Sequence, residues 1–332
     1  MRRFSILAAI LAWHVGAAWA APAAPTAPTA PTAPSALPRA HARADARDIT
    51  LDGASIYPES VTATADGTVY AGSLGGTIYR AAPGARAAKP WIVRSDANGL
   101  LSLFGVLADE RSGALWVCTA PAALPGGIPH GQSAVMRFNL HTGALLGRYL
   151  LPSPKAICDD IALARDGTAF VADIGAGEIL TLAPDADALR LFAHGPELAG
   201  IDGIAFGSDG TLYVDNVRRN ELLRVERTRD GRFDRLVKLH TSEPIAGPDG
   251  FRPAGGNRFV LAESRVGRID QVTIRGDEAR IDVLRSGLDS PSGVDFAGGA
   301  VYAVEGKIEY LFDPKLRARS PAPFIVHVLR LP

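Results

Sequence analysis

The chain has 332 residues, with 35 Lys and Arg against 35 Asp and Glu, so its formal net charge is zero. The sequence contains no basic cluster or stripe, which argues against a nucleic-acid partner. It also lacks a G-x-S-x-G nucleophile elbow, a P-loop and a dinucleotide fingerprint, so serine hydrolases, kinases and dehydrogenases are set aside.

The first residues are predicted to be a targeting segment rather than part of the fold. Two arginines precede an apolar run over 4–19, and an A-x-A cleavage site follows at 18–20, so 1–20 is predicted to be a secretory signal peptide. The run is shorter than the roughly 20 apolar residues that a membrane span needs. An Ala/Pro/Thr-rich linker at 21–45 follows it. We therefore expect an exported protein, periplasmic or secreted, with no transmembrane segment in the mature chain.

The remaining residues, 46–332, contain a repeat. Short apolar runs of strand length recur with a period in the forties, and each repeat shows up to four such runs separated by turns. The second run of each repeat lies at 68–71, 114–118, 168–172, 211–214, 258–262 and 300–304. No segment keeps a helical apolar period. The pattern predicts an all-β, six-bladed β-propeller with four-stranded antiparallel blades.

The last repeat lacks its outermost strand at the C-terminal end of the chain. We expect residues 47–51 to take that place, so that an N-terminal strand closes the ring. Closure of this kind removes the exposed sheet edges that favour aggregation.

Acidic residues recur at one fixed position, here called the slot, at the start of each repeat. Three of them stand seven residues before an Asp-Gly turn, and a fourth precedes Gly255-Gly256. The six slots are Glu59, Gly105, Asp159, Asp202, Asp249 and Ser292. The first strand of a propeller blade lines the central channel, so we expect the slots to surround one mouth of that channel.

A second set of polar residues follows the slots at a fixed distance of fourteen residues. The second strand of a blade is antiparallel to the first and returns to the same mouth. The set consists of Ser73, Thr119, Asp173, Asn216, Glu263 and Gly306, with Glu305 beside the last. These residues are predicted to form a second polar ring around the first.

Carboxylates that converge in a concave site raise one another's pKa unless a cation neutralises them. Oxygen ligands suit Ca²⁺ or Mg²⁺, and Ca²⁺ is favoured where six to eight oxygens and a loose geometry are available. A plainer interpretation is that Asp202-Gly203 and Asp249-Gly250 are ordinary turns.

The slot pattern resembles that of the calcium-dependent propeller superfamily, which includes gluconolactonases, regucalcin (senescence marker protein), paraoxonases and diisopropylfluorophosphatase. The resemblance rests on Pro58-Glu59-Ser60, on the acidic slots of the third to fifth blades, and on the Asp-Gly-Thr turns that follow. It implies that Glu59, Asp159, Asp202 and Asp249 bind the cation, most naturally Ca²⁺. The two middle-blade ligands are Asn in that family and Asp here.

The resemblance further implies hydrolysis of a small-molecule lactone or ester. The protein is expected to be a monomer. Asp249 is then the expected base that activates water, with Asp159 as the next choice. Contacts with the substrate, or with the residues that hold the substrate or the cation, are expected for Asp173, Asn216, Glu263, Phe104 and His130. Phe104 stands where gluconolactonase-like members have polar side chains, and His130 belongs to a Pro/Gly-rich insertion at 120–132.

Three alternatives remain open from the sequence. The acids could hold a structural ion in a non-catalytic propeller that binds a ligand or a protein. Lyase chemistry, as in streptogramin-inactivating propellers, would need a matching neighbourhood around the late His327. Cys118 and Cys158 could form a disulfide or remain as two buried thiols.

Overall fold

The computed structural model describes residues 48–122 and 130–331. Over these residues the regular secondary structure is almost entirely β, with strands β1–β25 and two one-turn helices, η1 (Pro196–Leu198) and α1 (Glu309–Phe312). The predicted all-β fold is confirmed. The predicted signal peptide and linker lie outside the described residues. Neither of the two described helices has the length and apolar character needed to cross a membrane.

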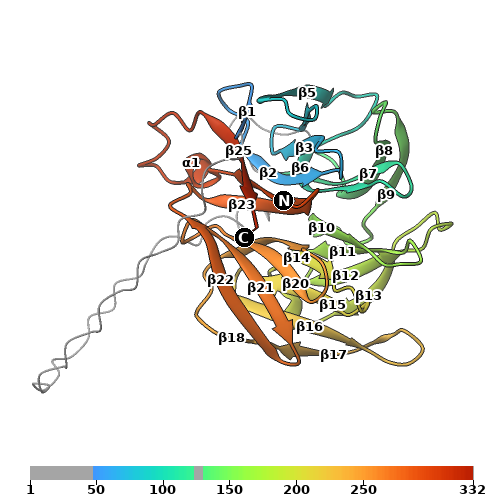
Figure 1. Ribbon diagram of the computed structural model, residues 1–332. Helices are drawn as coiled ribbons and strands as arrows, with labels where there is room; N and C mark the ends of the chain where they lie inside the picture. Colours follow the sequence, from blue (N-terminus) through green and yellow to red (C-terminus); the bar gives the residue numbers. More distant parts are fainter. Residues whose placement is uncertain (1–47, 123–129, 332) are drawn as a thin grey trace, which may run out of the picture. The chain divides into compact units, whose positions relative to one another are not determined.

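Antiparallel pairing divides most of the strands into groups of four, here called blades and named by their innermost strand (Figure 1); three of these groups are separate sheets, one carries a fifth strand, and two are joined in an eight-stranded sheet. The β2 blade comprises β2 (Pro58–Ala63), β3 (Val69–Ser73), β4 (Thr77–Ala81) and β5 (Ala87–Val93); the β6 blade comprises β6 (Ser102–Asp109), β7 (Ala114–Ala120), β8 (Ala134–Asn139) and β9 (Leu145–Leu150). The β10 blade comprises β10 (Cys158–Leu163), β11 (Ala169–Asp173), β12 (Glu178–Leu182) and β13 (Arg190–His194); the β14 blade comprises β14 (Ile201–Phe206), β15 (Leu212–Asn216), β16 (Glu221–Arg227) and β17 (Phe233–Lys238). The β19 blade comprises β19 (Pro248–Pro253), β20 (Arg258–Glu263), β21 (Arg268–Arg275) and β22 (Glu278–Ser286), with the short β18 (His240–Thr241) parallel to β22; the β23 blade comprises β23 (Pro291–Ala297), β24 (Ala300–Glu305), β25 (Phe324–Arg330) and β1 (Ile49–Leu51).

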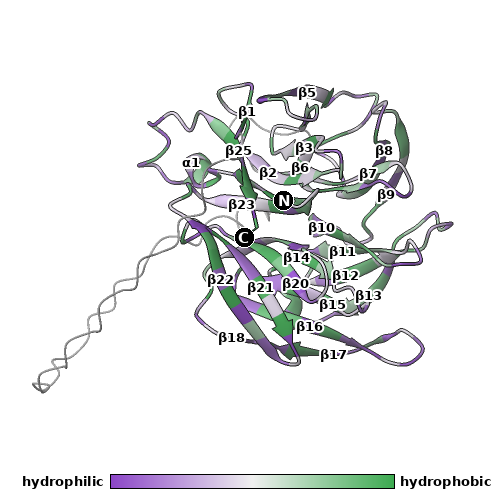
Figure 2. Cartoon of the chain, viewed as in Figure 1, coloured by the Kyte–Doolittle hydropathy of each residue, from purple (hydrophilic) through white to green (hydrophobic). Residues whose placement is uncertain are grey.

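The innermost strands contact one another in a closed cycle: β2 with β6, then β10, β14, β19, β23 and back to β2. Buried apolar side chains fill the spaces between neighbouring blades, as where Trp116 and Val135 of the β6 blade meet Ile161 of the β10 blade. In Figure 2 the apolar colour follows the strands and the polar colour many of the connecting turns. Four-stranded antiparallel blades are therefore confirmed. The count of six, with which the described blades agree, stays a prediction.

The N-terminal strand β1 completes the β23 blade. It pairs antiparallel with β25, where Ile49 lies opposite Val326, and its other edge runs parallel to β5. The predicted closing strand is thus present, although Arg47 lies outside the described residues. β1 covers one edge each of β25 and β5, so neither edge is open to pairing with another chain.

The Asp-Gly turns between first and second strands follow directly from the residue types. In each Asp-Gly-Thr turn the Asp carboxylate accepts a hydrogen bond from the Thr amide two residues later, at 2.8–2.9 Å. The glycine has φ near +87°, which a side chain would strain. These turns occur at Asp66-Gly67, Asp166-Gly167 and Asp209-Gly210. The local sequence at these turns therefore reverses the chain direction between the first and second strands of a blade.

A disulfide joins Cys118 on β7 to Cys158 on β10. Both residues are fully buried, and their Cα atoms lie 5.1 Å apart. Of the two alternatives left open by the sequence, the bonded one is found. The bond links the β6 blade to the β10 blade immediately before Asp159.

Candidate functional site

Each acidic slot lies at a β-bulge in an innermost strand. In β2 the pairing with β3 shifts between Pro58 and Ser60, which leaves Glu59 as the extra residue. Similar shifts accommodate Asp159 in β10, Asp202 in β14 and Asp249 in β19. Bulges re-aim side chains and are common beside active sites. The interpretation of Asp202-Gly203 and Asp249-Gly250 as turns is therefore wrong, because both pairs lie within strands.

The slot of the β6 blade is displaced by one residue from the predicted position. Phe104 and Gly105 together span the bulge of β6, as Asp202 and Gly203 span that of β14. Phe104 therefore occupies the slot. A Cβ on Gly105 would lie 2.5 Å from the carbonyl oxygen of Asp159, so glycine at this position allows neighbouring blades to approach.

The four acidic slots line one cavity at the channel mouth. Its water-accessible volume is about 10 Å³, enough for one water-sized sphere. Glu59, Asp159 and Asp202 are buried, whereas Asp249 is partly exposed. The cavity is completed by Ser60, Gly105, Asp160, Gly250, Arg252, Ser292 and Val294. The structure thus brings the four predicted ligands together around a space of ionic size.

Burial and mutual repulsion make these carboxyl groups weak acids in the absence of a cation. Burial raises the pKa of Glu59, Asp159 and Asp249 well above the usual range, and the charge of Asp202 raises each of them further. Burial also raises the pKa of Asp202 to about 7, although a hydrogen bond from Asp159 opposes the rise. Protonation or a bound cation would relieve this repulsion.

The sequence did not predict an ion pair that lines the same cavity as the four acidic slots. Arg252 of β19 reaches across the channel to Asp160 of β10 and binds it through both terminal nitrogens, with Nη2 2.6 Å from Oδ1. Nη1 also donates to the carbonyl of Phe251, and Nη2 to that of Val106 on β6. Arg252 is only 3% exposed. The available signal was a basic residue in the part of an innermost strand that follows the slot, where Phe251 and Arg252 are both buried.

Other acids surround the slots. Asp215 on β15 is fully buried and accepts a hydrogen bond from the Gly203 amide at 3.2 Å. Glu309 on α1 is close enough for its charge to raise the pKa of Asp249. Buried oxygens of Glu59, Asp215 and Glu309 have no hydrogen-bond partner among residues 48–122 and 130–331. The acid cluster is therefore larger than the sequence predicted, and Arg252 is the one basic side chain among the described residues that line the cavity.

These observations test whether the site fits a divalent cation. Unpaired buried carboxylate oxygens are the donors that hard cations prefer. Within 48–122 and 130–331, no three His, Cys, Asp or Glu side chains are already grouped as a metal-ligand set. The donor chemistry and the size of the cavity fit such an ion, and the carboxylates would draw together around it.

The predicted second ring has a structural role in the loops that precede the innermost strands. Asp173 accepts hydrogen bonds from the amides of Ile157, Gly175 and Ala176. Asn216 donates to the carbonyls of Glu197 and Ala199, and Glu263 accepts from the amide of Ala246. All three side chains are buried and none lines the acid cavity. Their hydrogen bonds hold the loops that lead into β10, β14 and β19.

The two remaining predicted contacts also lie outside the acid cavity. Phe104 is half-buried and packs against the apolar cluster between the β6 and β10 blades. His130 is exposed at the start of the described range 130–331. Most of the 120–132 insertion, at 123–129, lies outside the described residues.

The late histidine has closer neighbours than the sequence indicated. His327 Nδ1 lies 3.0 Å from Asp48 Oδ2, and its Nε2 lies 3.5 Å from Glu305 Oε1. These residues tie β1 to the β23 blade. None of them lines the acid cavity.

The fold and its acid-lined channel mouth define a β-propeller protein. A family model described as strictosidine synthase-like, N-terminal, matches residues 44–81. Comparison with curated protein sequences finds no relative of this chain.

Solved structures of propeller proteins resemble the chain over most of its length. A protein assigned as a gluconolactonase has a TM-score of 0.60 at 16% identity, covering 88% of this chain and 96% of that one. A luciferin-regenerating enzyme has a TM-score of 0.61 at 14% identity, covering 83% and 92%. Virginiamycin B lyase from Staphylococcus aureus has a TM-score of 0.57 at 14% identity, covering 86% and 98%. At these identities the likeness concerns the fold alone.

Proposed function

We propose that this protein is an exported hydrolase that opens a lactone or ester at a divalent cation in the channel mouth. The observation that carries the proposal is the set of four carboxyl groups on Glu59, Asp159, Asp202 and Asp249 around one cavity of ionic size. Among the described residues that line the cavity, only Arg252 opposes their charges, and it is already bound by Asp160.

Ca²⁺ is the cation proposed for this site. The donors are carboxylate oxygens from four different strands, and such a set can expand to a loose coordination shell more readily than to the tight octahedron of Mg²⁺. Within the part of the chain that the structure describes, neither histidine nor cysteine lines the cavity, so it offers no preferred ligand for the softer transition metals.

The residues of the site support hydrolysis in distinct ways. A bound cation would polarise the carbonyl group of the substrate. Asp249 is the most exposed of the four acids, and as a carboxylate it would accept a proton from the attacking water. The same carboxyl group then returns the proton to the departing alkoxide oxygen as the ester C–O bond breaks.

Export is supported by two features. The buried Cys118–Cys158 disulfide is typical of proteins from oxidising compartments. The N-terminal sequence has the pattern of a secretory signal peptide.

A non-catalytic propeller with a structural ion is the second candidate. It is favoured by the small size of the acid cavity, whose water-accessible volume of about 10 Å³ is enough for a single ion. In that case the acids would stabilise the channel, and ligand binding would occur elsewhere on the fold.

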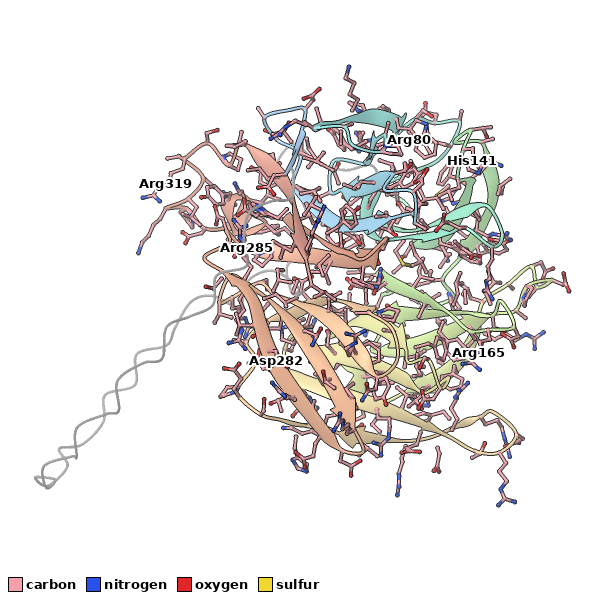
Figure 3. The ribbon with its side chains drawn as sticks, viewed as in Figure 1. Arg80, His141, Arg165, Asp282, Arg285 and Arg319 are labelled. Carbon is pink, nitrogen blue, oxygen red and sulfur yellow. A yellow bond between two sulfur atoms is a disulfide. The ribbon has the colours of Figure 1, made fainter. Side chains whose placement is uncertain are left out.

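Hydrolysis of a panel of aryl esters and lactones separates the two candidates. We expect turnover that EDTA abolishes and added Ca²⁺ restores. Asp249→Asn should lower the rate by about 100-fold or more, because general-base catalysis contributes that much. Asp282→Asn is the matched control, since Asp282 pairs with Arg280 on the outer strand β22 (Figure 3).

Turnover that is insensitive to both EDTA and Asp249→Asn would exclude the proposed mechanism. Ca²⁺ binding without turnover of any substrate on the panel would favour the structural ion.

A further inference from the structure

An exposed arginine of the β19 blade lies at the channel mouth that holds the acid cavity. The amide of Ser264 donates to the carbonyl of Gly247 at 2.8 Å, and Arg265 follows Ser264 in the loop between β20 and β21. The Arg265 side chain lies against Gly247, where a Cβ would be 2.7 Å from Arg265 Cγ. Gly247 precedes Asp249, the most exposed of the four acids, by two residues. Arg265 therefore stands beside the exposed edge of the acid site.

The neighbouring β14 blade repeats this arrangement. The amide of Val217 donates to the carbonyl of Gly200 at 3.0 Å, and Arg218 follows in the loop between β15 and β16. A Cβ on Gly200 would lie 2.6 Å from Arg218 Cγ, and Gly200 precedes Asp202 by two residues. Arg218 and Arg265 each stand sixteen residues after the acidic slot of their blade. Two consecutive blades thus present exposed arginines at equivalent positions of one mouth.

A third arginine joins these two where the blades meet. Asn220 of the β14 blade accepts hydrogen bonds through Oδ1 from the Gly247 amide at 2.8 Å and from Arg265 Nη1 at 3.4 Å. Arg219 is exposed, precedes Asn220 and donates to a backbone carbonyl. Within 48–122 and 130–331, no side-chain carboxylate lies within 4.0 Å of the guanidinium nitrogens of these arginines. We call this group the rim arginines: Arg218, Arg219 and Arg265.

The charges at this mouth indicate which substrates fit it. Four carboxylates around one divalent cation leave an excess of negative charge inside the cavity, whereas the rim arginines present positive charge to the solvent outside it. The planar guanidinium group can bind a carboxylate through two parallel hydrogen bonds. We propose that the rim arginines bind a carboxylate of the substrate, so that the protein acts on esters or lactones that carry an ionised acid group. This inference rests on the proposed hydrolysis at the cation site.

A matched pair of anilides tests the carboxylate site without requiring turnover. The mono-4-nitroanilide of adipic acid carries a carboxylate, and the corresponding primary amide is its neutral match. We expect the protein with added CaCl₂ to bind the acid at least about tenfold more tightly than the amide in calorimetric titrations, because hydrogen bonds between charged groups are the stronger ones. High NaCl should reduce this preference, since salt screens exposed charges.

Removing two of the positive charges should remove the preference for the acid. Arg218→Met combined with Arg265→Met should bind the acid and the amide equally, with the affinity for the amide unchanged. Arg265→Met alone is the second variant, which should lose part of the preference, in case the double variant does not fold. Arg229→Met is the matched control, because Arg229 is an exposed arginine in the turn between β16 and β17.

The outcomes separate this inference from the proposed hydrolysis. Equal affinity of the unchanged protein for both anilides, no measurable binding of either, or a full preference for the acid in a folded variant would overturn the carboxylate site. Mono-4-nitrophenyl adipate and its primary amide then report turnover. Hydrolysis of both esters with equal kcat/KM would contradict the carboxylate site alone, whereas preferred binding of the acid anilide without turnover of either ester would contradict the hydrolysis alone.

Discussion

Replacing Arg252 by methionine is expected to lower the free energy of unfolding by about 3–5 kcal/mol. The substitution keeps an apolar stem of similar length but leaves the carboxylate of Asp160 buried without its partner. Asp160 would retain a hydrogen bond from the Ile204 amide at 3.2 Å, which cannot replace a guanidinium bound through two nitrogens. Urea denaturation, followed by circular dichroism, measures this change in the free energy of unfolding.

A second substitution shows whether the loss comes from the unpaired charge. Arg252→Met combined with Asp160→Asn removes that charge, and much of the lost stability should return. Asp282→Asn, on β22, should change stability by less than about 1 kcal/mol, as is usual for a surface ion pair. If Arg252→Met alone stayed within that same margin, the ion pair would not hold the channel together.

Removing the disulfide has the second largest expected effect on stability. Cys118 and Cys158 are 40 residues apart in the sequence, and closing a loop of that length restricts the unfolded chain by about 4 kcal/mol. The double substitution to alanine should therefore unfold at a clearly lower urea concentration than the unchanged protein.

The disulfide also bears on the site, because Cys158 immediately precedes Asp159 at the bulge of β10. We expect the double variant to bind Ca²⁺ more weakly when it is folded. Val93→Ala, at an exposed position of β5, controls for the general effect of a shortened side chain. A loss of stability below about 1 kcal/mol would show that the blades are held together without the bond.

The positions of the acidic slots in their strands were predictable because the spacing from each slot to the following turn depends on local sequence. Each Asp-Gly-Thr turn fixes the return of the chain, so seven residues before it the chain always stands at the same point of the first strand. The β6 blade lacks this turn and has a longer hairpin that ends at Gly113. Because this blade has no Asp-Gly-Thr turn, the slot was predicted at Gly105 instead of Phe104. A shift of one residue is enough to move a side chain to the opposite face of a strand.

The pairing of Arg252 with Asp160 could not be predicted in the same way. The two residues are 92 positions apart, and their contact depends on how β19 and β10 face each other across the channel. The second polar ring shows a different limit. A residue such as Asp173 would be polar whether it contacted a ligand or, as found, the amides of the preceding loop.

The most direct test of the cation site is a calorimetric titration of the metal-free protein with CaCl₂ at pH 7, in two buffers of different ionisation enthalpy. Acids whose pKa is raised, Asp202 to about 7 among them, hold protons that Ca²⁺ must displace. We therefore expect one binding site, proton release on binding, and an affinity that increases from pH 5 to pH 8. No binding at millimolar Ca²⁺, with no proton release, would mean that the four acids hold protons instead of a cation.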